Sequence, residues 1–221
     1  MKKKVSKISL RGLPFWKPVN LINFILFLLS TYNCDLKTKN FNYIDLDLRE
    51  VVYISEIHYS GSSYSKYDNF LEIVNFAEFE IDISKWSLEI KNDSFYQLIS
   101  IPENVILKPK GIYTIGRTTN GGFTSFDLIY QELIIPDKGF IIELSDGSGK
   151  YSDKFILTNV ILPGGKSNGF YYSMIRKTGY FGPEDGNNIS NWHTFSLATP
   201  SDNVKTDSKV LASPGKTLSG E

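Results

Sequence analysis

The feature that most limits the fold of this chain is a series of short apolar runs, rich in β-branched and aromatic residues, with turn residues between them. No stretch shows a convincing helical period of 3.6 residues. Roughly nine such runs at short spacing predict an all-β sandwich or barrel. The runs lie at 51–54, 70–74, 86–90, 96–99, 112–115, 126–130, 140–144, 154–157 and 170–175.

Pro and Gly cluster where these runs stop, at 109–111, 120–122, 136–139, 146–149 and 163–165. Pro presets φ and Gly permits positive φ, so these clusters are places where the chain can reverse. Asp146 to Gly149 lies between two apolar runs and predicts the tip of a β-hairpin.

The first 34 residues have the layout of an export signal. A basic start is followed by the apolar run 21–29, then by a small polar stretch and the single cysteine, Cys34. Nine apolar residues are short for a membrane-spanning helix. The pattern resembles a bacterial lipoprotein signal, although Thr31 and Asn33 stand where Leu and a small residue are usual. It predicts a signal peptide over 1–33, lipidation of Cys34 and a polar tether over 34–49. A plain signal peptide, an uncleaved anchor and an incidental cysteine are the alternatives.

Two acidic residues interrupt predicted strands. Glu56 lies in "ISEIHY", and Glu72 shares a strand face with Phe70 and Val74, while Leu71 and Ile73 occupy the other face. Carboxylates held on strands can form an acid/base pair or ligate a divalent metal. The structural alternative, which we favour, is that each acid accepts hydrogen bonds from loop amides or lies at a sheet edge.

The order of several motifs resembles the lamin tail domain, an immunoglobulin-like β-sandwich. The matching positions run from residue 50 to 201 and include Ile54, Glu56, Ile57, Phe70, Glu72, Ile73, Asn75, Asp82, Ile83, Ser84, Trp86, Leu88, Pro102, Leu107, Pro109, Gly111, Ser173, Arg176, Asn191, Trp192, Thr199 and Pro200. The usual glycine after the last proline is missing.

This resemblance implies a fold and argues against catalysis. Members of the family share no catalytic residues and, outside the nuclear lamins, occur on secreted or envelope proteins, alone or beside hydrolases and nucleases. It implies that Trp86 fills the space between two sheets and that Glu56, Glu72 and Trp192 are structural. Residues 202–221 lack apolar periodicity and are predicted to be a flexible C-terminal extension.

A loop rich in Gly, Ser and Tyr follows the first predicted strand. His58, Tyr59, Tyr64 and Tyr67 are the candidate binding residues, because aromatic and small polar side chains on a rigid sandwich suit recognition of proteins or glycans. An ordinary flexible loop has the same composition.

Other chemistries find little support in the sequence. Six of the 24 basic residues precede the first acid, Asp35, so the rest of the chain is mildly acidic and nucleic-acid binding is not expected. His58 and His193 have no histidine nearby and there is one cysteine, so we expect neither a metal site nor a cofactor.

The sequence therefore predicts an exported, lipid-anchored envelope protein, not an enzyme, that binds an envelope or extracellular protein or glycan. The alternatives are an accessory module of a secreted hydrolase or nuclease, and a divalent-metal-dependent hydrolase that uses Glu56 and Glu72.

Overall fold

A computed structural model describes residues 51–157, 160–179, 182–196 and 200–216. The predicted signal peptide, Cys34 and the tether lie outside these residues. No helix within the described ranges is long and apolar enough to cross a membrane.

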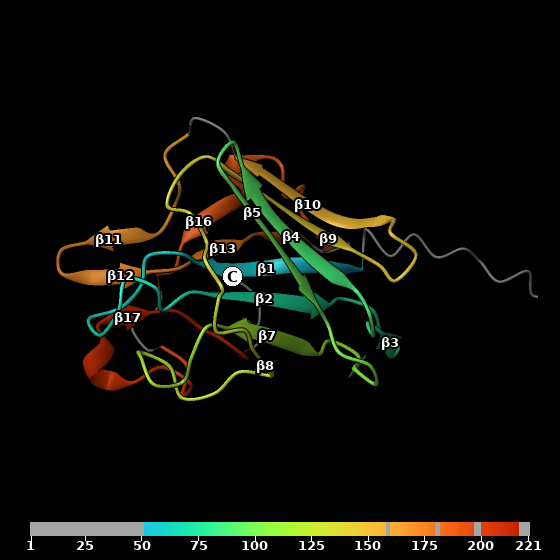
Figure 1. Cartoon of the computed structure of the whole chain (residues 1–221), viewed down its shortest axis with the longest axis horizontal. Helices are drawn as coiled ribbons and strands as arrows, with labels where there is room; N and C mark the ends of the chain where they lie inside the picture. The colour runs from blue at the N-terminus through green and yellow to red at the C-terminus, as the bar shows by residue number, and fades with distance from the viewer. Residues whose placement is uncertain (1–50, 158–159, 180–181, 197–199, 217–221) are drawn as a thin grey trace, which may run out of the picture. The chain divides into compact units, whose positions relative to one another are not determined.

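The larger sheet has six strands in the order β16 to β13 to β1 to β2 to β7 to β8 (Figure 1). All neighbours are antiparallel except β7 and β8, which are parallel. The strands are β1 (Val52–His58), β2 (Phe70–Asn75), β7 (Ile112–Gly116), β8 (Leu128–Ile129), β13 (Met174–Arg176) and β16 (Trp192–Thr194).

A second sheet of four antiparallel strands has the order β10 to β9 to β4 to β5. Its strands are β4 (Ser87–Asn92), β5 (Phe95–Ser100), β9 (Phe140–Ser145) and β10 (Tyr151–Leu157). The predicted hairpin tip at 146–149 connects β9 to β10, which confirms that part of the prediction.

Short strands form three further small sheets. The first contains β11 (Gly165–Ser167), β12 (Phe170–Tyr172) and β17 (Val210–Leu211); the others pair β14 (Thr178–Gly179) with β15 (Gly182–Pro183), and β3 (Ile81–Asp82) with β6 (Ile106–Leu107). Two single-turn 3-10 helices are η2 (Ile189–Asn191) and η3 (Thr206–Ser208).

One hydrophobic core joins the two larger sheets. It takes Leu71 and Ile73 from β2 and Leu88 and Ile90 from β4, the alternate positions that period-2 patterning predicts. Trp86 is buried in this core. The prediction of an all-β chain with sandwich-like packing of sheets is confirmed for the described residues.

A β-bulge at Ser55 decides which way Glu56 points. Ile54 pairs with Ile73, but Glu56 pairs with Glu72, so β1 carries one extra residue. Regular alternation from Ile54 would turn Glu56 toward the core. The bulge instead places Glu56 beside Glu72 on the outer face of the six-stranded sheet, and Ile57 takes the core position.

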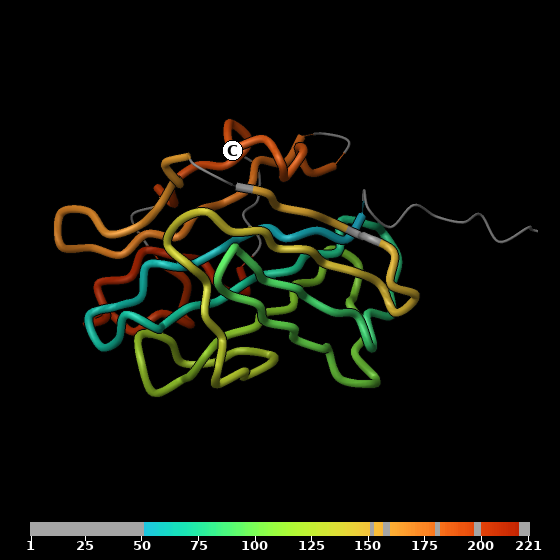
Figure 2. Tube along the Cα trace, turned by 45° about the horizontal axis from the view of Figure 1, so that its top comes forward, coloured from blue at the N-terminus to red at the C-terminus, as the bar shows by residue number. Residues whose placement is uncertain are grey.

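The C-terminal segment, residues 200–216, covers part of that outer face. Val204, Val210 and Ala212 form a second apolar cluster with Phe70 and Phe123. In Figure 2 this red segment lies with the β11–β12 hairpin and the loop after β1 at one end of the sheet. The prediction of a flexible extension from residue 202 is therefore wrong for 202–216, because spaced apolar side chains, rather than a strand-like period, attach this segment.

Candidate functional site

The four predicted binding residues are not placed alike. His58 and Tyr59 are buried, whereas Tyr64 and Tyr67 are 50% and 41% exposed. Tyr59 donates its hydroxyl to the Pro163 carbonyl at 2.9 Å, and burial raises its pKa to about 12. The expectation of a four-residue binding surface is thus corrected to Tyr64 and Tyr67, because the strand's apolar surroundings enclose the other two.

His58 lies within a cluster of aromatic rings. Its ring centroid is 5.4 Å from those of Phe70 and Phe123. Its Nε2 lies 2.7 Å from the Gly61 carbonyl, which can only accept, so Nε2 carries the proton and Nδ1 does not. Burial lowers the pKa of His58 to about 4. The imidazole is therefore a neutral structural group.

Hydrogen bonds fix the loop between β1 and β2. Asp68 accepts from the Ser62 hydroxyl and from the Gly122 amide, the latter at 2.9 Å. The Ser63 amide donates to the Ser208 carbonyl at 2.9 Å. A Cβ on Gly121 would lie 2.1 Å from Asp68 Oδ1, so this approach requires glycine. The loop that presents Tyr64 and Tyr67 is therefore held in place from two other parts of the chain.

Glu56 and Glu72 form a buried carboxyl pair. They are direct cross-strand partners, and only 1% and 4% of their surfaces are exposed. Burial raises the pKa of both, and the proximity of Glu56 adds to the shift that brings Glu72 to about 8. Two carboxylates at directly paired, buried positions disfavour double ionisation, so the pair retains a proton at neutral pH.

Hydroxyl and amide donors surround this pair. Glu56 accepts from the Ser173 hydroxyl and from both the amide and the hydroxyl of Ser213, the last two at 3.0 and 2.7 Å. Glu72 accepts from the Ser55 hydroxyl at 2.7 Å and from the Gly215 amide at 2.9 Å. The C-terminal segment therefore provides amides to both carboxyl groups.

This arrangement limits the chemistry of the pair. A substrate or metal could reach the carboxyl groups only after residues 213–215 moved away. Over the described ranges, no group of three or more His, Cys, Asp or Glu side chains is placed to hold a metal ion.

A shallow depression of about 440 Å³ lies beside the pair and opens to solvent. Its lining residues are Lys110, Ile112, Thr114, Ser125, Phe126, Asp127, Asn203 and Gly215. Thr114 faces Glu72 across β2 and β7, and both its amide and its hydroxyl donate to Asp127, at 2.7 and 2.8 Å. Gly215 separates this depression from the carboxyl group of Glu72.

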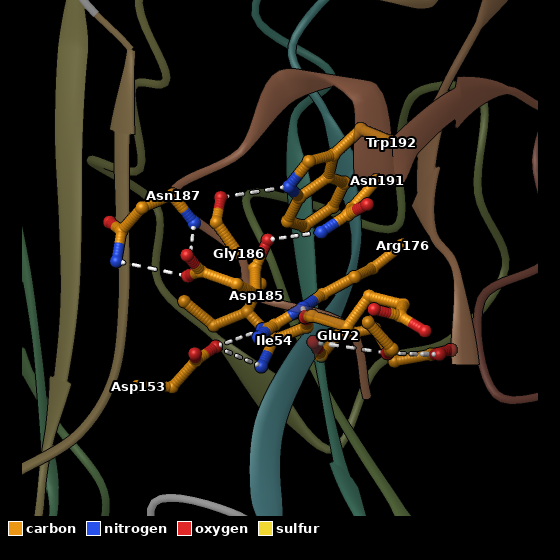
Figure 3. A network of polar contacts seen from close by, with 11 residues as sticks. Ile54, Glu72, Asp153, Arg176, Asp185, Gly186, Asn187, Asn191 and Trp192 are labelled. Carbon is orange, nitrogen blue, oxygen red and sulfur yellow. Dashed lines mark hydrogen bonds and ion pairs between the residues drawn. The ribbon is translucent and has the colours of Figure 1, made fainter. Parts of the chain in front are cut away.

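A buried ion pair joins the two sheets beside Ile54 of β1 (Figure 3). Arg176 Nη1 of β13 lies 2.6 Å from Asp153 Oδ2 of β10, which also accepts from the Ile54 amide at 2.9 Å. Burial raises the pKa of Asp153, and Arg176 opposes that shift.

Trp192 packs beside this ion pair. Its Nε1 donates to the Gly186 carbonyl at 3.0 Å, and the guanidinium of Arg176 lies 5.9 Å from its ring. Its ring also meets Phe155 edge-on, at 4.9 Å between centroids. Trp192 therefore packs against both sheets, as the predicted structural role requires.

Sequence reasoning missed the ion pair of Asp153 and the hydrogen bonds of Ser213 and Gly215 to the carboxyl pair. Asp153 lies in a run recognised only from residue 154, and the ion pair depends on a partner 23 positions away. Ser213 and Gly215 fall within 202–221, which the sequence predicted to be a flexible extension. A signal was present, because Val204, Val210 and Ala212 are apolar residues in an otherwise polar stretch.

The chain matches no protein-family model and no curated protein sequence. Its function therefore has to be argued from its own residues.

Proposed function

We propose that this protein is a lipid-anchored, non-catalytic β-sandwich of the lamin-tail, immunoglobulin-like kind that binds another component of the cell envelope or its surroundings. The observation that carries the binding part is the rigidly held loop with two exposed tyrosines. An exposed aromatic ring on a preorganised loop contributes contact area at little cost in conformational entropy.

The carboxyl pair supports a non-catalytic role. Both acids already accept hydrogen bonds from hydroxyls and amides of the protein, and their pKa values are raised by burial beneath residues 213–215. In this role the pair attaches the C-terminal segment to the sheet. The placement of Cys34 after a basic and apolar leader supports the anchor.

The anchor is tested by the intact mass of the N-terminal peptide from the detergent-soluble membrane fraction. We expect a peptide that begins at Cys34 and carries acyl chains, and release of Cys34→Ser into the soluble fraction. An unmodified N-terminus at Met1 would exclude the proposed anchor.

Binding is tested by crosslinking in whole cells. We expect Tyr64→Ala combined with Tyr67→Ala to lose the crosslinked envelope partner. Tyr96→Ala is the matched control, because Tyr96 is 62% exposed on the other sheet. Equal recovery of partner by all variants would refute the assignment of binding to this loop.

A further inference from the structure

The basic residues at one end of the sandwich differ from those elsewhere in what they contact. Six described cations are paired with carboxylates, and two of them, Lys110 and Arg176, also lie over aromatic rings. These ion pairs are Lys85 with Glu103, Lys91 and Lys154 with Glu143, Lys108 with Glu80, Lys110 with Glu78, and Arg176 with Asp153.

At the end that carries the loop after β1, the cations lie against aromatic rings instead. Lys66 Nζ and Arg117 Cζ are 4.7 and 4.9 Å from the centroid of the Tyr67 ring. Lys205 Nζ is 5.7 Å from the Tyr64 ring. Among the described residues, no carboxylate lies within ion-pair distance of these three cations. A cation over a ring keeps its full charge, so these three cations outweigh the carboxylate of Asp207, to which Tyr64 donates, and this end retains positive potential.

The same surface continues onto the β11–β12 hairpin. Tyr64 donates its hydroxyl to Asp207, and two residues later the carbonyl of Lys209 accepts from the Tyr171 amide at 2.9 Å. Lys166 Nζ lies 5.1 Å from the Tyr171 ring, and Phe170 beside it is 43% exposed. We call this surface the cationic end; it comprises Tyr64, Lys66, Tyr67, Lys166, Phe170 and Lys205.

The cationic end stands out against the charge of the rest of the protein. Residues 51–216 contain 15 Lys and Arg against 19 Asp and Glu, so an acidic body carries a local basic surface. Three exposed rings lie among its cations. A ligand that complements both features has repeated negative charges and flat apolar faces.

We propose that the cationic end binds an acidic polysaccharide, a polymer of sugar rings that carry carboxylate or phosphate groups. The spaced cations pair with successive anions, and the C–H faces of the sugar rings pack on Tyr64, Tyr67 and Phe170. This proposal rests on the proposed function and names the class of its partner.

The cationic end and the first described residues lie at opposite ends of β1. The chain enters the sheet at Val52, and the loop that carries Tyr64 and Tyr67 follows His58 at the opposite end of β1. Seven residues of strand separate the two ends, a span of about 20 Å. The cationic end therefore lies away from the point at which the tether joins the sandwich.

The test measures binding of the full-length, detergent-solubilised protein to immobilised polygalacturonate, with neutral dextran as the uncharged comparison. We expect retention on polygalacturonate only, weakened by added salt. Lys66→Gln combined with Lys166→Gln should weaken binding by about 10-fold or more, because it removes charge from both parts of the surface.

The matched control combines Lys85→Gln with Lys108→Gln, which changes net charge equally at two other exposed, remote lysines. We expect it to bind like the wild type. The polysaccharide assignment would be overturned by equal loss of binding in both double variants or by equal retention on dextran. It would also be overturned if the protein bound only phosphatidylglycerol vesicles or single-stranded DNA. Such a result, with the tyrosine-dependent crosslink in cells intact, would leave the proposed function standing.

Discussion

The backbone amide of Ser213 lies 3.0 Å from Glu56 Oε1 and its hydroxyl 2.7 Å from Glu56 Oε2, although 157 residues separate the two. This contact fixes the C-terminal segment on the outer face of the first strand. It also gives a buried acid a specific partner.

Ser213→Ala should lower the free energy of unfolding by about 1–3 kcal/mol, because it leaves one oxygen of a buried carboxyl group with no donor. Urea denaturation measures this change. Ser167→Ala, in the exposed β11–β12 hairpin, is the control and should shift the free energy by no more than about 0.5 kcal/mol. Equal effects of the two variants would contradict the role of Ser213.

The carboxyl pair should make stability depend on pH. Glu72 has a pKa of about 8 in the folded protein against 4.5 ordinarily, so the folded state holds a proton that the unfolded state releases between these values. The free energy of unfolding should therefore fall as the pH rises through this window.

Glu72→Gln should flatten this dependence. The Gln carbonyl can still accept from Gly215, and its amide can donate to the Ser55 hydroxyl. Denaturation at about pH 6.5 and about pH 8 measures the slope, and Glu78→Gln, at a side chain 83% exposed, should leave it unchanged. A full slope in Glu72→Gln would assign the pH dependence to other groups.

His58 should contribute a dependence of opposite sign at lower pH. Its pKa is about 4 in the folded protein and 6.5 ordinarily, so the unfolded chain binds a proton first as the pH falls. The stability contributed by His58 should therefore decrease from about pH 6.5 toward about pH 4, and it opposes the contribution of Glu72 where the two pH windows overlap.

His58→Gln should remove this acid-side loss, and thermal unfolding across the same range measures it. His193→Gln serves as the control, because His193 is only partly buried. If the two variants lost stability in acid to the same extent as the wild type, His58 would not be the responsible group.

Much of the sandwich could be predicted from the sequence because its core strands alternate in the usual way. Leu71, Ile73, Leu88 and Ile90 show the period of two and occupy the core. The run at 126–130 was harder, because only Leu128 and Ile129 form a strand. The strand predicted over 170–175 is instead divided at Ser173, whose amide pairs with Leu211.

The candidate site was predicted less completely. Glu56 and Glu72 stood out as acids within apolar runs, but their pairing depends on the bulge at Ser55, and the amides that donate to them come from 157 and 143 residues away. The burial of His58 likewise depends on Phe123, which only the folded chain brings to it. Long-range contacts of this kind leave no local pattern.

Arg176→Met should be among the most destabilising single changes, by about 3–5 kcal/mol, because it leaves the Asp153 carboxylate buried without its cation. Both side chains are nearly inaccessible, at 4% and 6% exposure. Adding Asp153→Asn should restore part of the loss, which urea denaturation of the double variant measures.

Lys177→Met is the control, since Lys177 is exposed and its side chain donates one hydrogen bond, to the Ser190 carbonyl. A loss in Arg176→Met no larger than in Lys177→Met would show that the ion pair contributes little.

The contact between Glu56 and Ser213 also sets an order of events during biosynthesis. A chain released from the ribosome residue by residue can pair β1 with β2 early, yet the outer face of that hairpin keeps two partly desolvated acids and Phe70 uncovered until residue 213 emerges. Closing so long a loop is a slow, late step in folding. A chain truncated before this residue would display an apolar and acidic face that chaperones and proteases recognise, so the contact distinguishes chains that contain residue 213 from shorter ones.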